Sequence, residues 1–271
     1  MSSGVPFENK RCSSGAQPNI KAQMEERKAE DQQQEEEEVV HQLAEGRAVR
    51  LRVASRFEGS HFSVEDQGCF LWPAARPLCD YLLAHGEELT HGRRCLELGA
   101  GAGLCACVVA KFLRPLRFVT TDNSEKALYF LKTNLEIAGK EEPTDRSCSA
   151  ECMPFDWADP SPLSTLNAED GFDLVFGSDL VWDSAGANLL FAVVKRALRP
   201  TKEALFLLSF VPRSEFLRSY VREAATAEGF FLESVVVVPL GGGEDQKRKT
   251  GSYSQMEVEI LRFKLLSQSY D

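Results

Sequence analysis

The residues best suited to chemistry in this sequence form a short glycine-rich run after an apolar stretch. Gly99, Gly101 and Gly103 alternate with alanines, and the mainly apolar segment 104–113 comes next. Glycine lacks a Cβ atom, so it lets the backbone turn tightly and come close to a ligand. The helix expected after the run has free N–H groups in its first turn. A strand, a glycine turn and a helix in this order are typical of a nucleotide-type site at the edge of a parallel sheet.

The spacing of the glycines argues against one class of nucleotide site. The dinucleotide fingerprint Gly-x-Gly-x-x-Gly would need glycine at position 104, where this sequence has leucine. An acidic residue, Glu97, instead stands two positions before Gly99. A carboxylate there suits a ligand that carries an ammonium group, whereas it would repel a pyrophosphate. An NAD-dependent oxidoreductase is therefore disfavoured.

A second acid stands at the end of the next apolar segment. Asp122 follows Gly103 by nineteen residues, and its carboxylate can accept hydrogen bonds from ribose hydroxyls. Adenosine with a cationic amino-acid tail describes S-adenosyl-L-methionine. Asp156 and Trp157 follow a further short strand, where a carboxylate and an aromatic ring suit the amino group and the ring of adenine.

A third polar group follows the apolar run that starts at Phe172. The run ends at Ser178 and Asp179, at the edge where ligands bind in open α/β folds, and Trp182 comes shortly after. Asp179 is either a site residue or the cap of the following helix. Trp182 can line a channel and contact a cation through its ring. Trp72, upstream of the whole unit, is either a site residue or a core aromatic.

Composition restricts the classes of function. The chain has 271 residues, a net charge of −10 and a pI near 5.1, which argues against general nucleic-acid binding. It has no run of 18 apolar residues and no apolar signal region at the N-terminus, so we expect no membrane span and no secretion. Its eight cysteines lack the spacing of a zinc site, and we expect no metal. The expected compartment is reducing: the cytoplasm, with the nucleus as an alternative.

The N-terminal part divides into a tail and a strand-rich start. Residues 1–44 are predicted to be a disordered acidic tail, because the segment 21–38 is almost entirely charged or amide-bearing. The remaining residues, 45–271, are predicted to form one domain. Val49, Leu51 and Val53 alternate with polar or small residues, which predicts a half-buried strand. The segment 61–64 is predicted to complete an N-terminal β-hairpin with it.

Strands and helices are predicted to alternate through the rest of the chain. This order indicates an α/β fold with a largely parallel sheet. Gly139 is predicted to end a helix, and 140–147 and 159–170 are predicted to be loops. The apolar patterns predict helices over 74–85, 123–138, 187–198 and 214–228, and strands over 150–154, 172–178, 204–210, 235–238 and 256–263.

These residues together resemble the class I, seven-β-strand S-adenosylmethionine-dependent methyltransferases. Within that class the chain is similar to the family-16 branch of protein methyltransferases, which are mostly lysine-directed. The resemblance runs from about residue 48 to 266 and is carried by 71–75, 97–103, 122–123 with 131–134, and 172–182. It implies a Rossmann-like seven-stranded sheet, mostly parallel with an antiparallel last strand, with helices on both faces.

The resemblance also implies roles for individual residues. Asp179 would hold the target amine near the sulfonium, and Ser178 would lie beside the methionine part of the cofactor. Asp122 and Asn123 would contact the ribose, and Asp156 and Trp157 would lie near adenine. Further cofactor contacts are implied at Trp72, Glu97, Gly99, Gly101 and Gly103.

The leading hypothesis is an S-adenosylmethionine-dependent protein N-methyltransferase that modifies a lysine. Trp182 stands where the family pattern usually has tyrosine, which keeps an aromatic ring but loses the hydroxyl. One alternative is a catalytically silent cofactor-binding scaffold that acts through its acidic tail. Another is a small-molecule methyltransferase, although such enzymes often cover the pocket with added helices. We expect a monomer with a protein substrate and no membrane or nucleic-acid partner, and the target nitrogen stays open.

Overall fold

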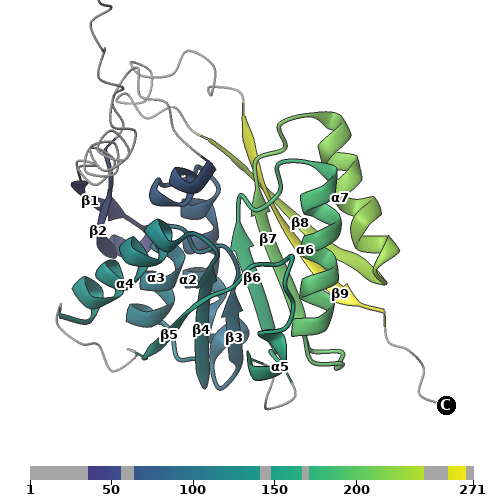
Figure 1. Cartoon of the computed structure of the whole chain (residues 1–271), viewed down its shortest axis with the longest axis horizontal. Helices are drawn as coiled ribbons and strands as arrows, with labels where there is room; N and C mark the ends of the chain where they lie inside the picture. The colour runs from purple at the N-terminus through teal and green to yellow at the C-terminus, as the bar shows by residue number, and fades with distance from the viewer. Residues whose placement is uncertain (1–35, 56–63, 141–147, 167–170, 241–255, 267–271) are drawn as a thin grey trace, which may run out of the picture. The chain divides into compact units, whose positions relative to one another are not determined.

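The fold is built around a seven-stranded sheet (Figure 1). The computed structural model describes residues 36–55, 64–140, 148–166, 171–240 and 256–266. Across the sheet the strands are β5 (Ala150–Pro154), β4 (Arg117–Asp122), β3 (Arg94–Glu97), β6 (Leu174–Ser178), β7 (Leu205–Phe210), β9 (Glu257–Leu265) and β8 (Phe230–Pro239). β9 is antiparallel to both of its neighbours, and the other neighbouring strands are parallel. The predicted fold class, with an antiparallel last strand, is confirmed.

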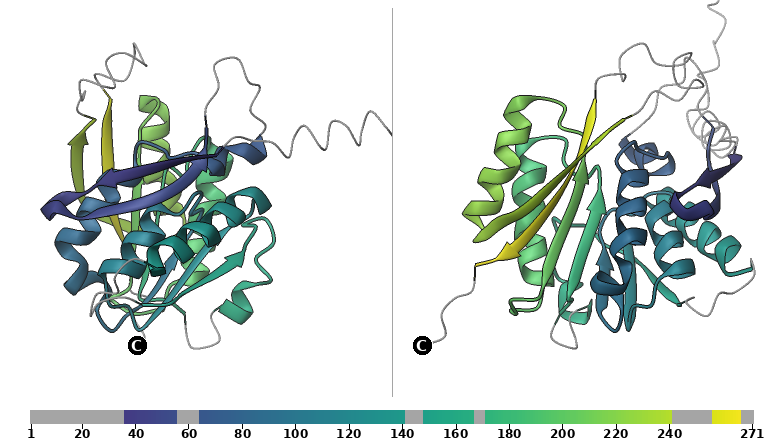
Figure 2. Two further views of the ribbon diagram at one scale, coloured as in Figure 1. Left: turned by 90° about the vertical axis from the view of Figure 1, so that its left-hand side faces the viewer. Right: turned by 180° about the vertical axis from the view of Figure 1, so that it is seen from behind.

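Two hydrophobic cores lie on opposite faces of this sheet. In β3, Cys95 belongs to one core and Leu96 to the other, and Leu207 and Leu208 of β7 divide in the same way. Successive strand side chains point to opposite faces, so strands covered on both sides are apolar throughout. Figure 2 shows the helices on either side. The first core includes α2 (Ala75–Thr90), α3 (Leu104–Phe112) and α4 (Glu125–Lys140), and the second α5 (Leu163–Leu166), α6 (Ser184–Ala197) and α7 (Glu215–Ala227).

The N-terminal hairpin is present, but its partner strand is not the predicted one. β2 (Ala48–Ala54) pairs in antiparallel with β1 (Glu36–Gln42), and the short 3-10 helix η1 (Ala44–Gly46) connects them. Of the predicted partner 61–64, only Val64 is described, and it begins the 3-10 helix η2 (Val64–Cys69). The prediction of disorder was therefore wrong for 36–44, while residues 1–35 and 61–63 lie outside the described residues.

The polar composition of β1 concealed this strand from sequence analysis. Its acids face arginines of β2: Arg50 Nη1 donates to Glu38 Oε1, and Arg52 Nη1 lies 4.0 Å from Glu36 Oε2. Opposite charges across an antiparallel pair stabilise the pairing. β2 supplies the buried face of the hairpin, in the alternation that its sequence predicted.

Several element boundaries also differ from the predictions. α2 continues to Thr90, β8 already begins at Phe230, and α5 lies inside the predicted loop 159–170. α4 passes through Gly139, the predicted stop, and ends at Lys140. Glycine ends a helix when the chain then adopts a left-handed conformation, and Gly139 is not among the described glycines with positive φ.

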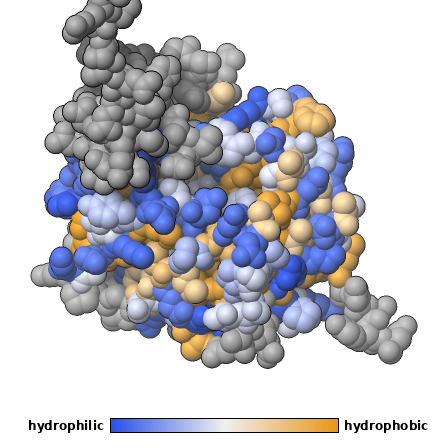
Figure 3. All heavy atoms as spheres, in the orientation of Figure 1, coloured by the Kyte–Doolittle hydropathy of each residue, from blue (hydrophilic) through white to orange (hydrophobic). Residues whose placement is uncertain are grey.

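The surface shown in Figure 3 mixes polar and apolar residues. Apolar and polar side chains alternate over short distances on this face, as is usual for a folded protein surface. Within the described residues, no helix combines the length and the apolar character that a membrane span requires.

Asn134, on α4, joins the hairpin to the glycine run. Its side chain is 0% exposed. Its Nδ2 donates to the carbonyl oxygens of Arg52 (2.8 Å) and Ala102 (2.7 Å), and its Oδ1 accepts from the N–H of Arg52 (2.6 Å). Buried polar groups are stable only when they are hydrogen-bonded, so one amide satisfies backbone groups of two separate segments. It thereby holds the hairpin and the glycine turn against α4.

We expect Asn134→Ala to lower the free energy of unfolding by about 2–4 kcal/mol, because it leaves buried backbone groups without partners. Urea unfolding followed by circular dichroism measures this change. Lys132→Ala, an exposed position on the same helix, is the matched control and should change stability by less than about 0.5 kcal/mol. Equal stability of the two variants would contradict the joining role of Asn134.

Candidate active site

The site lies at the carboxyl ends of β3 and β6, where the order of the strands reverses. From β3 the chain adds β4 and β5 on one side of the sheet, and it then returns to add β6 and β7 on the other. Ligands of open α/β sheets bind in the crevice at this reversal. The segments that follow these five strands carry most of the predicted site residues.

The glycine run turns sharply and is tied to the end of β4. Gly101 has a φ of +56°, and a Cβ atom there would lie 2.9 Å from the carbonyl oxygen of Gly68. The N–H of Gly101 donates to Asp122 Oδ2 (2.9 Å), and the N–H of Ala100 donates to the carbonyl of Thr121 (2.9 Å). Any side chain at position 101 would therefore push two backbone segments apart.

Asp122 has a carboxylate that is held in place on both oxygens. Oδ2 accepts from Gly101 N–H, and Oδ1 accepts from Ser124 N–H at 3.0 Å. Burial raises the pKa of Asp122, and these backbone hydrogen bonds oppose that shift. A carboxylate has about four acceptor positions, so it retains capacity for ligand hydroxyls. Asn123, the other predicted ribose contact, is exposed beside it.

Glu97 lies in the interior, which the sequence did not indicate. Its carboxyl group accepts a hydrogen bond from Thr120 Oγ1 (2.8 Å) between β3 and β4, and the residue is 2% exposed. Burial raises the pKa of Glu97 to about 8, and the nearby Asp122 adds to the shift. The carboxyl group is therefore mostly protonated at neutral pH. A contact between Glu97 and a ligand ammonium group stays a prediction.

Trp157 lies next to the start of the glycine run. A Cβ atom on Gly99 would lie 2.7 Å from Leu180 Cδ2 and 3.7 Å from Trp157 Cζ2, so the absence of a side chain at Gly99 makes room for both. Gly99 and Gly103 share the positive φ of Gly101. Asp156 is exposed, and its Oδ1 accepts from the N–H of Ala158 (2.9 Å). The indole ring is thus part of the crevice, whereas Asp156 shapes its own turn.

Asp179 joins three segments through one carboxylate. Oδ2 accepts from the N–H of Ala74 (3.0 Å) and Oδ1 from the N–H of Val211 (3.1 Å), while Arg213 Nη2 lies 3.6 Å from Oδ1. The side chain is 1% exposed. Burial raises the pKa of Asp179, and the two hydrogen bonds and Arg213 oppose that shift. Its φ of +53° is uncommon for a residue other than glycine, and such conformations gather at functional sites.

The interpretation of Asp179 as a helix cap is wrong. The N-cap of α6 is Asp183, whose Oδ1 accepts from the N–H of Gly186 (2.7 Å). Asp179 is thus free of that task, which favours the site interpretation. Ser178, the last residue of β6, is half-buried directly before it.

Two tryptophans that are far apart in the sequence meet beside Asp179. The rings of Trp72 and Trp182 pack edge to face, with 4.6 Å between their centroids. The Nε1 of Trp72 donates to the carbonyl of Gln67 (2.8 Å), which fixes its orientation. Arg213 Cζ lies 3.8 Å from the centroid of Trp182 and 5.9 Å from that of Trp72. Sequence analysis missed Arg213, although it lies just after the carboxyl end of a predicted strand.

The predicted residues thus form two neighbouring groups. One contains the glycine run with Asp122 and Trp157, and the other contains Trp72, Asp179 and Trp182. The backbone from Trp72 to Ala74 and the segment 178–182 carry the second group beside the first. In the described part of the chain, no three His, Cys, Asp or Glu residues gather as metal ligands would.

Comparison with known families decides the assignment. A family model described as lysine methyltransferase matches residues 59–226, which is more than half of the chain. The chain belongs to the lysine methyltransferase family. Enzymes of this family depend on S-adenosyl-L-methionine, and the site fits that cosubstrate. Its glycine run has no room for side chains, Asp122 retains acceptor capacity, and Trp157 offers a ring.

Curated relatives of this methyltransferase act on proteins. It is 28% identical over 183 residues to "Protein N-terminal and lysine N-methyltransferase efm7" of Emericella nidulans, covering 65% of this chain and 68% of that protein. It is 24% identical over 165 residues to "Calmodulin-lysine N-methyltransferase" of Arabidopsis thaliana, covering 60% of this chain and 52% of that protein. The matched region thus spans between about half and about two thirds of these relatives.

Solved structures confirm the fold. TYW2 of M. jannaschii, solved in complex with AdoMet, has a TM-score of 0.50 at 12% identity, covering 84% of this chain and 87% of that one. The [4+2]-cyclase SpnF has a TM-score of 0.51 at 18% identity, covering 69% and 79%. At 12% and 18% identity, the likeness supports the fold alone.

We expect Trp157→Ala to weaken binding of S-adenosyl-L-methionine about three- to tenfold, since the variant removes a ring that can pack on adenine. Isothermal titration calorimetry measures the dissociation constant. Phe216→Ala, which removes an exposed aromatic ring on α7, is the control and should leave it unchanged. Unaltered affinity in Trp157→Ala would remove Trp157 from the cofactor site.

Stability should fall as pH rises from about 4.5 to about 8 because of Glu97. The folded state keeps the Glu97 proton up to about pH 8, whereas the unfolded chain releases it near pH 4.5, so alkaline pH favours unfolding. Glu97→Gln cannot ionise at this position. We expect its free energy of unfolding, minus that of the natural chain, to increase by on the order of 1 kcal/mol or more as the pH rises from 5 to 9. Thermal unfolding across this range measures the gain, and a constant difference would contradict the raised pKa.

Proposed function

We propose that this protein transfers methyl groups from S-adenosyl-L-methionine to the side-chain nitrogen of a lysine in a protein substrate. The observation that carries the proposal is the placement of Asp179, in a left-handed conformation, beside the paired rings of Trp72 and Trp182. This group adjoins the glycine run, so an amine beside the rings would lie close to a bound cofactor. The named activities of the curated relatives support the same reaction.

Methyl transfer requires the protein to position the two reactants and to provide a suitable electrostatic environment for them. Bound S-adenosyl-L-methionine supplies the methyl group on a sulfonium, whose sulfur keeps the electron pair of the broken C–S bond. The amine must be neutral when it attacks, whereas a free lysine has a pKa near 10.4, so a proton must leave to solvent. We propose that the residues around Asp179 hold the amine in line and exclude water from it.

Asp179 acts in this proposal mainly by fixing its neighbours. Because its side chain is 1% exposed and both oxygens accept backbone hydrogen bonds, it positions the segments that carry Trp72 and Arg213. This differs from the role of holding the target amine, which the resemblance to the family implied. Trp182, 43% exposed, is proposed to contact the substrate.

The remaining assignments are also proposals. We assign Glu97, Gly99, Gly101, Gly103 and Ser178 to the methionine side of the cofactor, Asp122 and Asn123 to its ribose, and Asp156 and Trp157 to its adenine. We propose a monomer that works in a reducing compartment, the cytoplasm or the nucleus, where the free cysteines of the described segments stay reduced.

A protein N-terminal amine is a second candidate acceptor. The efm7 relative is named for both protein N-terminal and lysine methylation. An α-amino group has a pKa near 8, so it loses its proton more easily than a lysine does. The same site could therefore accept a protein N-terminal amine without any change in the residues that bind the cofactor.

Methyl transfer to a protein tests the proposal. The purified protein is incubated with a cell lysate and methyl-labelled S-adenosyl-L-methionine, and the labelled residue is identified by mass spectrometry. We expect a discrete labelled protein, and a drop of at least about tenfold in Trp182→Ala, which loses a substrate contact worth about 1.4 kcal/mol or more. Lys195→Ala, on the exposed side of α6, is the control. The proposal would be contradicted if the label appeared only on small molecules. It would also be contradicted if the protein bound the cofactor but no protein in the lysate were labelled.

A further inference from the structure

The ring face that could hold a substrate cation is already in contact with a cation of this chain. Arg213 Cζ lies 3.8 Å from the centroid of Trp182, so the guanidinium is in contact with the ring. The same group lies 5.9 Å from the centroid of Trp72 and 3.6 Å from Asp179 Oδ1. A guanidinium and an ammonium bind an aromatic face through the same attraction, so they compete for it.

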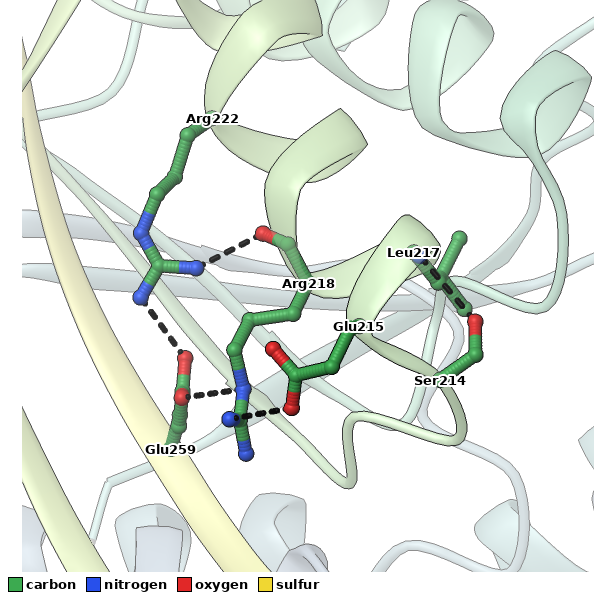
Figure 4. Close-up of polar contacts among 6 residues, drawn as sticks. All are labelled: Ser214, Glu215, Leu217, Arg218, Arg222 and Glu259. Carbon is green, nitrogen blue, oxygen red and sulfur yellow. Dashed lines mark hydrogen bonds and ion pairs between the residues drawn. The ribbon is translucent and has the colours of Figure 1, made fainter.

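The backbone on both sides of Arg213 is firmly held. Val211 N–H donates to Asp179, and Ser214 caps α7 by accepting from Leu217 N–H at 3.1 Å. Figure 4 shows how α7 is fixed in turn: Arg218 and Arg222 both pair with Glu259 of β9 at 2.9 Å. A change in the position of the guanidinium therefore requires rotation of the side chain and no movement of the loop.

The Arg213 side chain itself is held weakly. Its Nη1 is buried and has no hydrogen-bond partner among the described residues, which is an unfavourable arrangement for a charged donor. Its ion pair with Asp179 is long, and that carboxylate already accepts two backbone hydrogen bonds. Among the described residues its contacts are thus this ion pair and the two tryptophan rings, so a competing cation has no side-chain hydrogen bond of Arg213 to break.

We propose that Arg213 is a specificity-determining residue, whose guanidinium occupies the cation-binding face of Trp182 until a methyl acceptor displaces it. The proposal rests on the proposed function, since the acceptor is an amine. An acceptor on a protein gains binding energy from contacts outside this face, and that energy offsets the displacement of Arg213. A small free amine can bind only to the Trp182 face and lacks these additional contacts. Arg213 therefore selects amines carried by proteins over small free amines.

Binding of a free amine tests the displacement without any methyl transfer. The probe is n-butylammonium chloride, followed by tryptophan fluorescence, with sodium chloride matching its ionic strength. We expect the n-butylammonium concentration at the midpoint of the fluorescence change to be about fivefold lower in Arg213→Met than in the natural chain. A fivefold change in this concentration corresponds to about 1 kcal/mol of cation–π energy. The double variant Arg213→Met/Trp182→Ala should lose the response. Lys195→Met, a distant cation on α6, should behave like the natural chain.

Two further measurements, on Arg213→Lys and on methylation kinetics with a protein acceptor, test the inference independently. Arg213→Lys keeps the charge without the planar group, and its midpoint should lie between those of the natural chain and Arg213→Met. With a protein acceptor, Arg213→Met should lower KM while kcat changes less than twofold. Equal midpoints in the natural chain and Arg213→Met would overturn the inference. If the midpoints shift but neither the natural chain nor a variant methylates a protein, the proposed function is contradicted, while the occupation of the Trp182 face by Arg213 is supported.

Discussion

The arrangement of the site depends on one buried carboxylate. Asp179 accepts hydrogen bonds from Ala74, which precedes β3 in the chain, and from Val211, which follows β7. Without these bonds, two backbone N–H groups would be buried without partners, at a cost of about 1–3 kcal/mol each. A carboxylate at the end of β6 therefore brings Trp72 and Arg213 to the same place, although they lie 141 positions apart in the sequence.

The cofactor side of the site is organised by the same physical rule. Asp122 accepts from the backbone of the glycine run and from Ser124, and Asn134 satisfies backbone groups of the run and of the hairpin. In each case a short polar side chain bonds to backbone, which fixes a loop more precisely than apolar packing does. The hairpin is thereby coupled to the glycine run, even though β1 and β2 lie outside the main sheet.

Three acidic side chains of the site are buried. Burial raises the pKa of Glu97 to about 8, and Asp122 and Asp179 are both nearly buried. The charged group that reaches the aromatic pair is the guanidinium of Arg213. A cation beside the aromatic rings disfavours the charged form of a nearby amine, and methyl transfer needs the neutral form.

The sequence by itself determined the fold class, the glycine turn and the acid that ends β4. Apolar runs that are buried on both faces, the glycine spacing and the acid at the end of β4 are local signals, so they can be read without knowing what packs against them. Only the tertiary structure decided the partner of β2, the burial of Glu97 and the presence of Arg213 against Trp182. These depend on contacts between segments that are distant in the chain, and a local sequence pattern does not specify such contacts.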